Sequence, residues 1–128
     1  MLTVTKRFEF AYGHHLPGYD GLCKNSHGHN AIVEVEVRRS KSKKTPKPYD
    51  GMIVDFKDLK QLVKSQLDYL DHQYLNELPA FEKINPTAEN MTKVLVDALE
   101  KAFTGRGIEL VRLRVSETSD SWAEWKED

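Results

Sequence analysis

The sequence predicts an α+β domain in which an antiparallel β-sheet is covered on one face by two helices. At both ends of the chain, apolar residues alternate with polar ones in the two-residue period of half-buried strands. In the middle, between residues 56 and 103, the apolar spacing follows the helical period of about 3.6 residues. Strands grouped at the ends of a chain and helices in its middle are typical of this class.

The first two strands are predicted over residues 2–14 and 27–37. In the first, the even positions form one face that is almost entirely apolar and ends in His14. In the second, His27 and His29 share a face with an alanine and three valines. All three histidines are therefore expected on the apolar faces of neighbouring strands.

A short strand at Met52–Val54 is predicted to precede the first helix. That helix is expected over Phe56–Leu70, with Asp55 as its N-cap. The second helix is expected to begin with Asn85 as its cap and Pro86 at the first helical position, where proline is favoured.

Glycines at 105 and 107 are predicted to end the second helix, and a strand over residues 109–117 follows. Alternation assigns its odd positions to the core face: Glu109, Val111, Leu113, Val115 and Glu117. A last short strand is expected over Trp122–Trp125. The predicted order is thus three strands, two helices and two strands.

The composition predicts one globular domain over residues 1–128 that binds neither nucleic acid nor membranes. A net charge of −1 gives no excess of positive charge for a polyanion. No segment resembles a secretory leader or reaches membrane-spanning length, which predicts a cytoplasmic protein. The basic run 38–48 carries six cations and two prolines, and we interpret it as a solvated loop.

His14, His27 and His29 are candidate metal ligands. In His-x-His the two imidazoles project from the same face of a strand, and His14 is in register to supply the third, whereas His15 points to the other face. Three neutral imidazoles with an open fourth position are typical of catalytic Zn²⁺. The alternative is that these histidines only bond backbone carbonyls at a turn.

Cys23 is the single cysteine, so the chain has no internal disulfide. It follows a glycine-containing turn and precedes Lys24, a setting that can lower a thiol pKa and make the thiol reactive. Two other interpretations stay open: an inert buried thiol, or a fourth ligand that closes a structural zinc site.

Asp71 and His72 are adjacent at the predicted end of the first helix, and Glu117 ends the core face of a strand. A carboxylate that orients a histidine is a proton-handling pair, although a histidine at a helix C-terminus is also favoured by the helix dipole. A carboxylate on a buried face needs a cation or several N–H donors as a partner. For Glu117, a ligand with two neighbouring N–H groups or an arginine would serve.

These residues lie in segments that resemble the 6-pyruvoyltetrahydropterin synthase superfamily, and within it the 6-carboxytetrahydropterin synthases of queuosine biosynthesis. The resemblance covers nearly the whole chain in six blocks that follow the family's order: 10–17, 23–30, 54–56, 70–76, 85–89 and 115–118. The three-residue gap between Cys23 and His27 resembles the queuosine branch, because the pyruvoyl branch generally has a longer gap.

The resemblance implies a tunnelling-type fold and a zinc-dependent lyase. Zn²⁺ would be held by His14, His27 and His29, with Cys23 as catalytic base, Asp71 and His72 as proton relay and Glu117 as the anchor of the pterin ring. The implied reaction converts 7,8-dihydroneopterin triphosphate to 6-carboxy-5,6,7,8-tetrahydropterin, with release of triphosphate and acetaldehyde. The alternatives are a 6-pyruvoyltetrahydropterin synthase, or a non-catalytic zinc-stabilised pterin-binding module.

The resemblance also implies a homo-oligomer, a trimer or hexamer, in which sheets of several subunits join into a barrel. The sheet predicted from the sequence agrees with this, because its two edges are not visibly blunted by charges or prolines, and exposed edges tend to pair with other chains.

Overall fold

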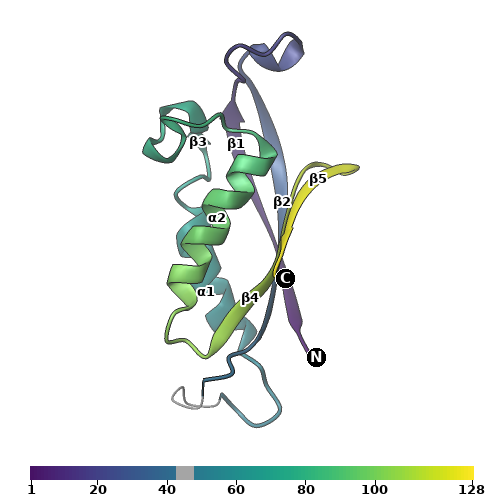
Figure 1. Cartoon of the computed structure of the whole chain (residues 1–128), viewed down its shortest axis with the longest axis vertical. Helices are drawn as coiled ribbons and strands as arrows, with labels where there is room; N and C mark the ends of the chain where they lie inside the picture. The colour runs from purple at the N-terminus through teal and green to yellow at the C-terminus, as the bar shows by residue number, and fades with distance from the viewer. Residues whose placement is uncertain (43–47) are drawn as a thin grey trace.

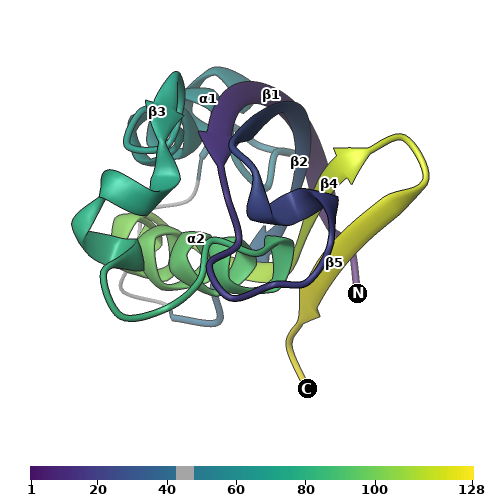
Figure 2. The same ribbon diagram turned by 90° about the horizontal axis from the view of Figure 1, so that it is seen from above.

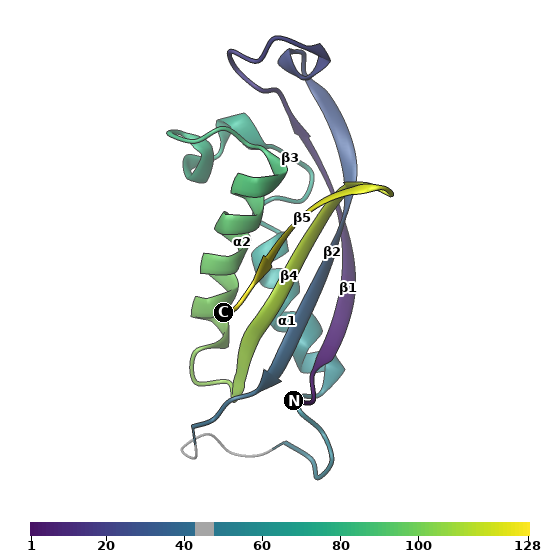
Figure 3. The ribbon, with the colours of Figure 1, turned by 45° about the vertical axis from the view of Figure 1, so that its right-hand side comes forward.

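The computed structural model describes residues 1–42 and 48–128. Two helices, α1 (Phe56–Leu67) and α2 (Ala88–Phe103), cover one face of a five-stranded sheet (Figure 1). The predicted α+β class is thereby confirmed. The strands are β1 (Val4–His14), β2 (His27–Arg39), β3 (Gln73–Tyr74), β4 (Ile108–Thr118) and β5 (Ser121–Lys126). The sheet order is β3-β1-β2-β4-β5, and Figure 3 shows the four longer strands side by side.

The long hairpin β1–β2 is the centre of the sheet and follows the predicted alternation. Its strands pair antiparallel from Val4 opposite Val37 to His14 opposite His27. The even positions of β1 and the odd positions of β2 face the helices, and their apolar side chains join one buried cluster with the helices. Because the period of a strand is two, both strands keep one apolar face from end to end.

The third strand lies in a different place from the predicted one. Residues 52–54 are not in a strand, and Ile53 and Val54 form a bend in a loop and pack against the core. The third strand is instead β3, which follows α1 and pairs in parallel with β1 at Tyr12 and Gly13, so the sheet is mixed. A strand of two residues is too short to show an alternating pattern in the sequence. Its pairing with β1 depends on where the chain emerges from α1.

Both helices begin with a side-chain cap, and one of the two predicted caps is wrong. Asp55 caps α1 by accepting from the Lys57 amide at 2.8 Å, as predicted. α2 is capped by Thr87, whose hydroxyl accepts from the Asn90 amide at 3.1 Å, and not by Asn85. Threonine is a favoured N-cap residue, although asparagine ranks above it. Pro86 therefore lies outside the helix, which leaves its carbonyl free to bond elsewhere.

β4 contains a β-bulge that divides its inward face into two registers. Arg112 is opposite Glu36 and Leu110 is opposite Val37, so Val111 is one residue extra. Leu113 is buried as predicted, but beyond the bulge Leu110 is buried in place of its odd-numbered neighbours. The prediction that Glu109 and Val111 lie on the core face is therefore wrong.

The face of the sheet that the helices leave uncovered carries ion pairs. Arg112 bonds glutamates on three sides: Glu34, Glu36 and Glu124. Near the end of β2, Arg38 bonds Glu109 and Glu127. Because these charges are paired, this face needs no apolar cover.

The basic run predicted as a loop begins inside β2, because Arg38 and Arg39 belong to that strand. Its residues 43–47 lie outside the described residues. Within 1–42 and 48–128, no helix is long and apolar enough to cross a membrane.

Candidate metal centre

Three histidines converge where β1 ends and β2 begins. His14 is directly opposite His27, and His29 follows on the same face of β2. One ring nitrogen from each lies within 4.8 Å of the others, and among the described residues these three form the group able to hold a metal ion. The hairpin register thus brings together two ligands that are close in sequence and a third from the neighbouring strand.

The hydrogen bonds of two of these rings determine which nitrogens face one another. The His14 Nδ1 lies 2.7 Å from the Pro86 carbonyl, and the His27 Nδ1 lies 2.8 Å from the Asn25 carbonyl. A carbonyl only accepts, so each Nδ1 carries the proton and each Nε2 of a neutral ring presents a lone pair. The two Nε2 atoms are 2.9 Å apart. Two facing lone pairs repel, and a cation bound by both removes that repulsion.

The donor set therefore fits a divalent transition metal. Burial lowers the pKa of His14, which favours the neutral imidazole that binds metal. Three imidazoles leave a fourth coordination position for water or substrate, as in catalytic zinc sites. The Pro86 and Asn25 carbonyls hold the two rings in orientation, and the carbonyl of Pro86 is available because α2 begins two residues later than predicted.

His15 lies outside this group, as its position in the alternation predicts. Its Nδ1 lies 2.5 Å from the Tyr74 hydroxyl, which also lies 2.7 Å from the Ser26 hydroxyl. The Asn76 side chain accepts from the His15 amide and donates to its carbonyl. Of the two adjacent histidines, only His14 faces the metal centre.

A cavity of about 430 Å³ lies beside the histidines and brings together three of the predicted site residues, His14, Cys23 and Glu117. Its other walls are residues 16–19 and the start of α2, residues 85 and 87–89. Figure 2, which looks down on this end of the molecule, shows the β1–β2 connection next to the start of α2. Cys23 is half-buried in a 3-10 turn, Leu22–Lys24, and is not in the converging ligand group.

Glu117 reaches this cavity from a second bulge in β4. Ser116 pairs with Trp122 and Thr118 with Ser121, so Glu117 is the extra residue. Its Oε1 accepts from the Tyr12 hydroxyl at 3.0 Å, and its Oε2 lies 4.0 Å from the His29 Nε2.

The sequence indicates an arginine or a ligand as the partner of this carboxylate, and the structure supplies Tyr12. Burial and the neighbouring Glu117 raise the pKa of Tyr12, so its hydroxyl stays a donor. In the sequence, the only indication that Tyr12 belongs to the site is its place on the inward face of β1, two residues before His14.

Asp71 and His72 lie elsewhere in the same chain. α1 ends at Leu67, and the pair occupies the following turn, where His72 has a φ of 60°. Asp71 accepts from the Ala11 amide at 2.9 Å, which lowers the pKa of its carboxyl, and lies 2.9 Å from the His72 Nδ1. The His72 side chain is 82% exposed and lines a different cavity, one without Cys23.

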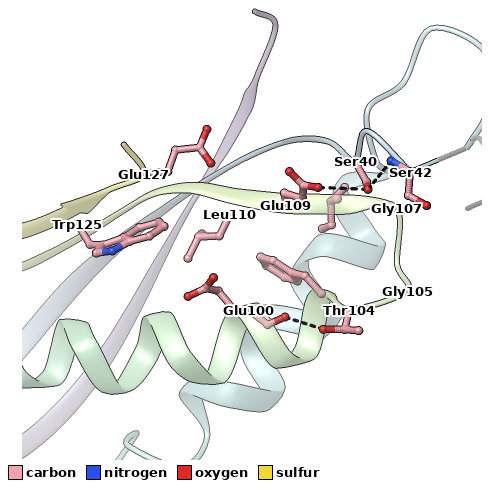
Figure 4. A pocket seen from close by; sticks show the side chains of 12 residues that line it. Ser40, Ser42, Glu100, Thr104, Gly105, Gly107, Glu109, Leu110, Trp125 and Glu127 are labelled. Atoms are coloured by element: carbon pink, nitrogen blue, oxygen red, sulfur yellow. Dashed lines mark hydrogen bonds between the residues drawn. The ribbon is translucent and has the colours of Figure 1, made fainter.

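A larger cavity of about 620 Å³ lies at the opposite end of the sheet (Figure 4). Figure 4 shows its acidic lining, in which Ser40 bonds Glu109. Glu109 and Glu127 both form ion pairs with Arg38. This cavity shares no lining residue with the one beside the histidines, so size alone does not indicate the site.

Fold and site together define an α+β protein with a three-histidine group able to hold a metal ion, built on one end of a β-hairpin. The chain belongs to the 6-pyruvoyl tetrahydropterin synthase family, whose model matches residues 3–128.

Two relatives illustrate the similarity. A 6-carboxy-5,6,7,8-tetrahydropterin synthase of Haemophilus influenzae is 30% identical over 99% of this chain and 100% of its own length. One of Synechocystis is 36% identical over 80% of this chain and 78% of its own. The fold is that of 6-pyruvoyl tetrahydropterin synthase from Caenorhabditis elegans, with a TM-score of 0.82 and 23% identity over 99% of this chain and 96% of that one.

Proposed function

We propose that this chain is a zinc-dependent lyase that converts 7,8-dihydroneopterin triphosphate to 6-carboxy-5,6,7,8-tetrahydropterin, releasing triphosphate and acetaldehyde. The observation that carries the proposal is the cavity lined jointly by His14, Cys23 and Glu117. It brings a metal ligand, a thiol and a carboxylate to one small volume. The relatives named 6-carboxy-5,6,7,8-tetrahydropterin synthase support this choice of reaction.

Each residue then has a distinct task. The amino group and adjacent ring N–H of the pterin form a double donor, which the Glu117 carboxylate accepts. Zn²⁺ on His14, His27 and His29 would act as a Lewis acid toward the side-chain hydroxyls of the substrate. Cys23, as thiolate, removes the neighbouring C–H proton, and its half-buried place in the cavity wall supports this role.

The product mixture tests the proposal directly. Zinc-loaded protein is incubated with 7,8-dihydroneopterin triphosphate, and the pterin product and acetaldehyde are measured. A 6-carboxytetrahydropterin with equimolar acetaldehyde is expected. The family's own description favours one second candidate, 6-pyruvoyl tetrahydropterin synthase, which would release triphosphate without acetaldehyde. An unconsumed substrate would leave only the non-catalytic binding module.

We further propose that the working unit is a homo-oligomer, a trimer or hexamer whose sheets join into a barrel. Within one chain, Cys23 and His72 of the Asp71–His72 pair line different cavities. A proton relay between them requires the pair from a neighbouring subunit. The sheet supports such an arrangement because β5 ends it with an unpaired edge, and β1 is paired on its outer side only at Tyr12 and Gly13 among the described residues.

His72→Ala should therefore bind substrate but slow turnover by about 100-fold or more, the usual range for a lost proton-transfer group. Asp71→Asn should act in the same direction.

Mixed oligomers of Cys23→Ala and His72→Ala subunits should recover activity, since some sites then combine an intact thiol with an intact relay. Steady-state rates of the singles and of the mixture measure this. Unchanged rates in the singles would reduce the pair to its backbone-bonding role, and a fully active monomer in sedimentation would contradict the shared site.

A further inference from the structure

Tyr12 connects the metal centre to Glu117. Its side chain is only 4% exposed, and its ring contacts those of His14 and His29 at centroid distances of 5.2 and 5.5 Å. Its hydroxyl leaves this aromatic cluster and donates to the Glu117 Oε1. Packing against the histidine rings thus fixes the Tyr12 ring, and its hydroxyl forms a hydrogen bond with the Glu117 carboxylate.

Glu117 lies beside the metal centre, next to one of the three histidines. Its Oε2 is 4.0 Å from the His29 Nε2. Ligand atoms about 2.0–2.2 Å from a tetrahedral zinc lie roughly 3.3 Å from one another. A shift of less than about 1 Å would bring the carboxylate to that spacing from His29, and a further movement toward His14 and His27 would make it a fourth ligand. Carboxylate oxygens are ordinary zinc ligands, so an unrestrained glutamate here would close the open position.

We propose that the Tyr12 hydroxyl holds Glu117 outside the coordination sphere. Tyr12 is then a positioning residue with two effects. It keeps the fourth metal position open for substrate, and it keeps the carboxylate available to the two N–H groups of the pterin. The second effect rests on the proposed function, whereas the first depends only on metal binding by the three histidines.

The decisive variant is Tyr12→Phe, which removes the hydroxyl and keeps the ring that packs between Phe10 and the histidines. Glu117 should then move onto the metal. With Co²⁺ as the bound ion, the visible absorption spectrum should change because a carboxylate replaces solvent. Neopterin, used as a probe without a triphosphate, should bind about tenfold more weakly or worse, as expected for a lost hydrogen bond to a charged group.

Two further variants isolate the cause. In Tyr12→Phe/Glu117→Gln the Co²⁺ spectrum should return to the wild-type form, because a neutral amide does not take the place of the carboxylate. Tyr69→Phe is the matched control, since it also removes one bonded hydroxyl, here one that accepts from the Ala80 amide in the 3-10 turn Pro79–Phe81. Its spectrum and its neopterin affinity should equal those of the wild type.

The outcomes separate this inference from the proposed function. A wild-type Co²⁺ spectrum and neopterin affinity in Tyr12→Phe would overturn the inference and leave the function standing. A spectral change in Tyr12→Phe that persists in the double variant would also overturn it, because Glu117 would not be the cause. If the wild type binds Co²⁺ but not neopterin, the proposed function fails, and the spectra alone decide whether Tyr12 restrains Glu117. A wild type that binds no Co²⁺ overturns both.

Discussion

Replacing His14 with alanine should abolish stoichiometric zinc binding and catalysis together. His14 is the buried member of the three ligands, and its ring is fixed by the bond from Nδ1 to the Pro86 carbonyl. The change leaves two imidazoles on β2, too few for a stable site. Loss of a hydrogen-bond partner behind a ligand commonly lowers metal affinity about 10- to 100-fold. Removal of the ligand itself should exceed about 100-fold in zinc affinity, measured by competition with a chelator.

His15→Ala is the matched control, because it removes an imidazole from the adjacent position on the opposite face. Its partner is the Tyr74 hydroxyl, so zinc content and turnover should both be retained. Full zinc occupancy in His14→Ala, or loss of zinc in His15→Ala, would show that the wrong one of the two histidines has been assigned to the metal.

Cys23→Ala should reduce turnover by about 10²–10⁴-fold while zinc content and pterin binding stay at wild-type levels. The expectation follows from the position of Cys23, in the wall of the cavity it shares with His14 but outside the converging ligand group. Single-turnover kinetics, together with zinc analysis of the same sample, separate the chemical step from metal loading. Asp20→Ala, an exposed change in the same connection between β1 and β2, should leave the rate unchanged.

Loss of zinc from Cys23→Ala would contradict this role. The thiol would then be the fourth ligand of a closed structural site, and the non-catalytic binding module would become the better description of the protein.

The metal centre is the part of the molecule that the sequence predicts best. Strand alternation and antiparallel pairing have fixed geometry, so the sequence alone assigns His14, His27 and His29 to one face. Alternation does not predict the ring orientations, which depend on tertiary packing. The carbonyls of Asn25 and Pro86 orient two of the rings, and both come from backbone whose path depends on a turn and on the start of α2.

The errors arise where one residue changes a register. Thr87 caps α2 two residues later than Asn85 would, and the residue preference at N-caps ranks asparagine above threonine, so it favours the wrong residue. The bulge at Val111 reverses the alternation of β4 without any glycine or proline to indicate it. The bond between Tyr12 and Glu117 joins residues 105 positions apart, and only the complete sheet brings them together.

The bulge at Val111 also makes β4 unequally tolerant of changes in length. Without Val111 the strand would alternate regularly, with Leu110 and Leu113 still directed inward and Arg112 between them directed out. Loss of Leu113 or Arg114 would instead turn an arginine toward the helices, or turn a buried apolar side chain, Leu113 or Val115, away from them. Chain-length differences among related proteins should therefore be accommodated at position 111 of this strand, whereas the segment that carries Glu117 should keep a constant number of residues.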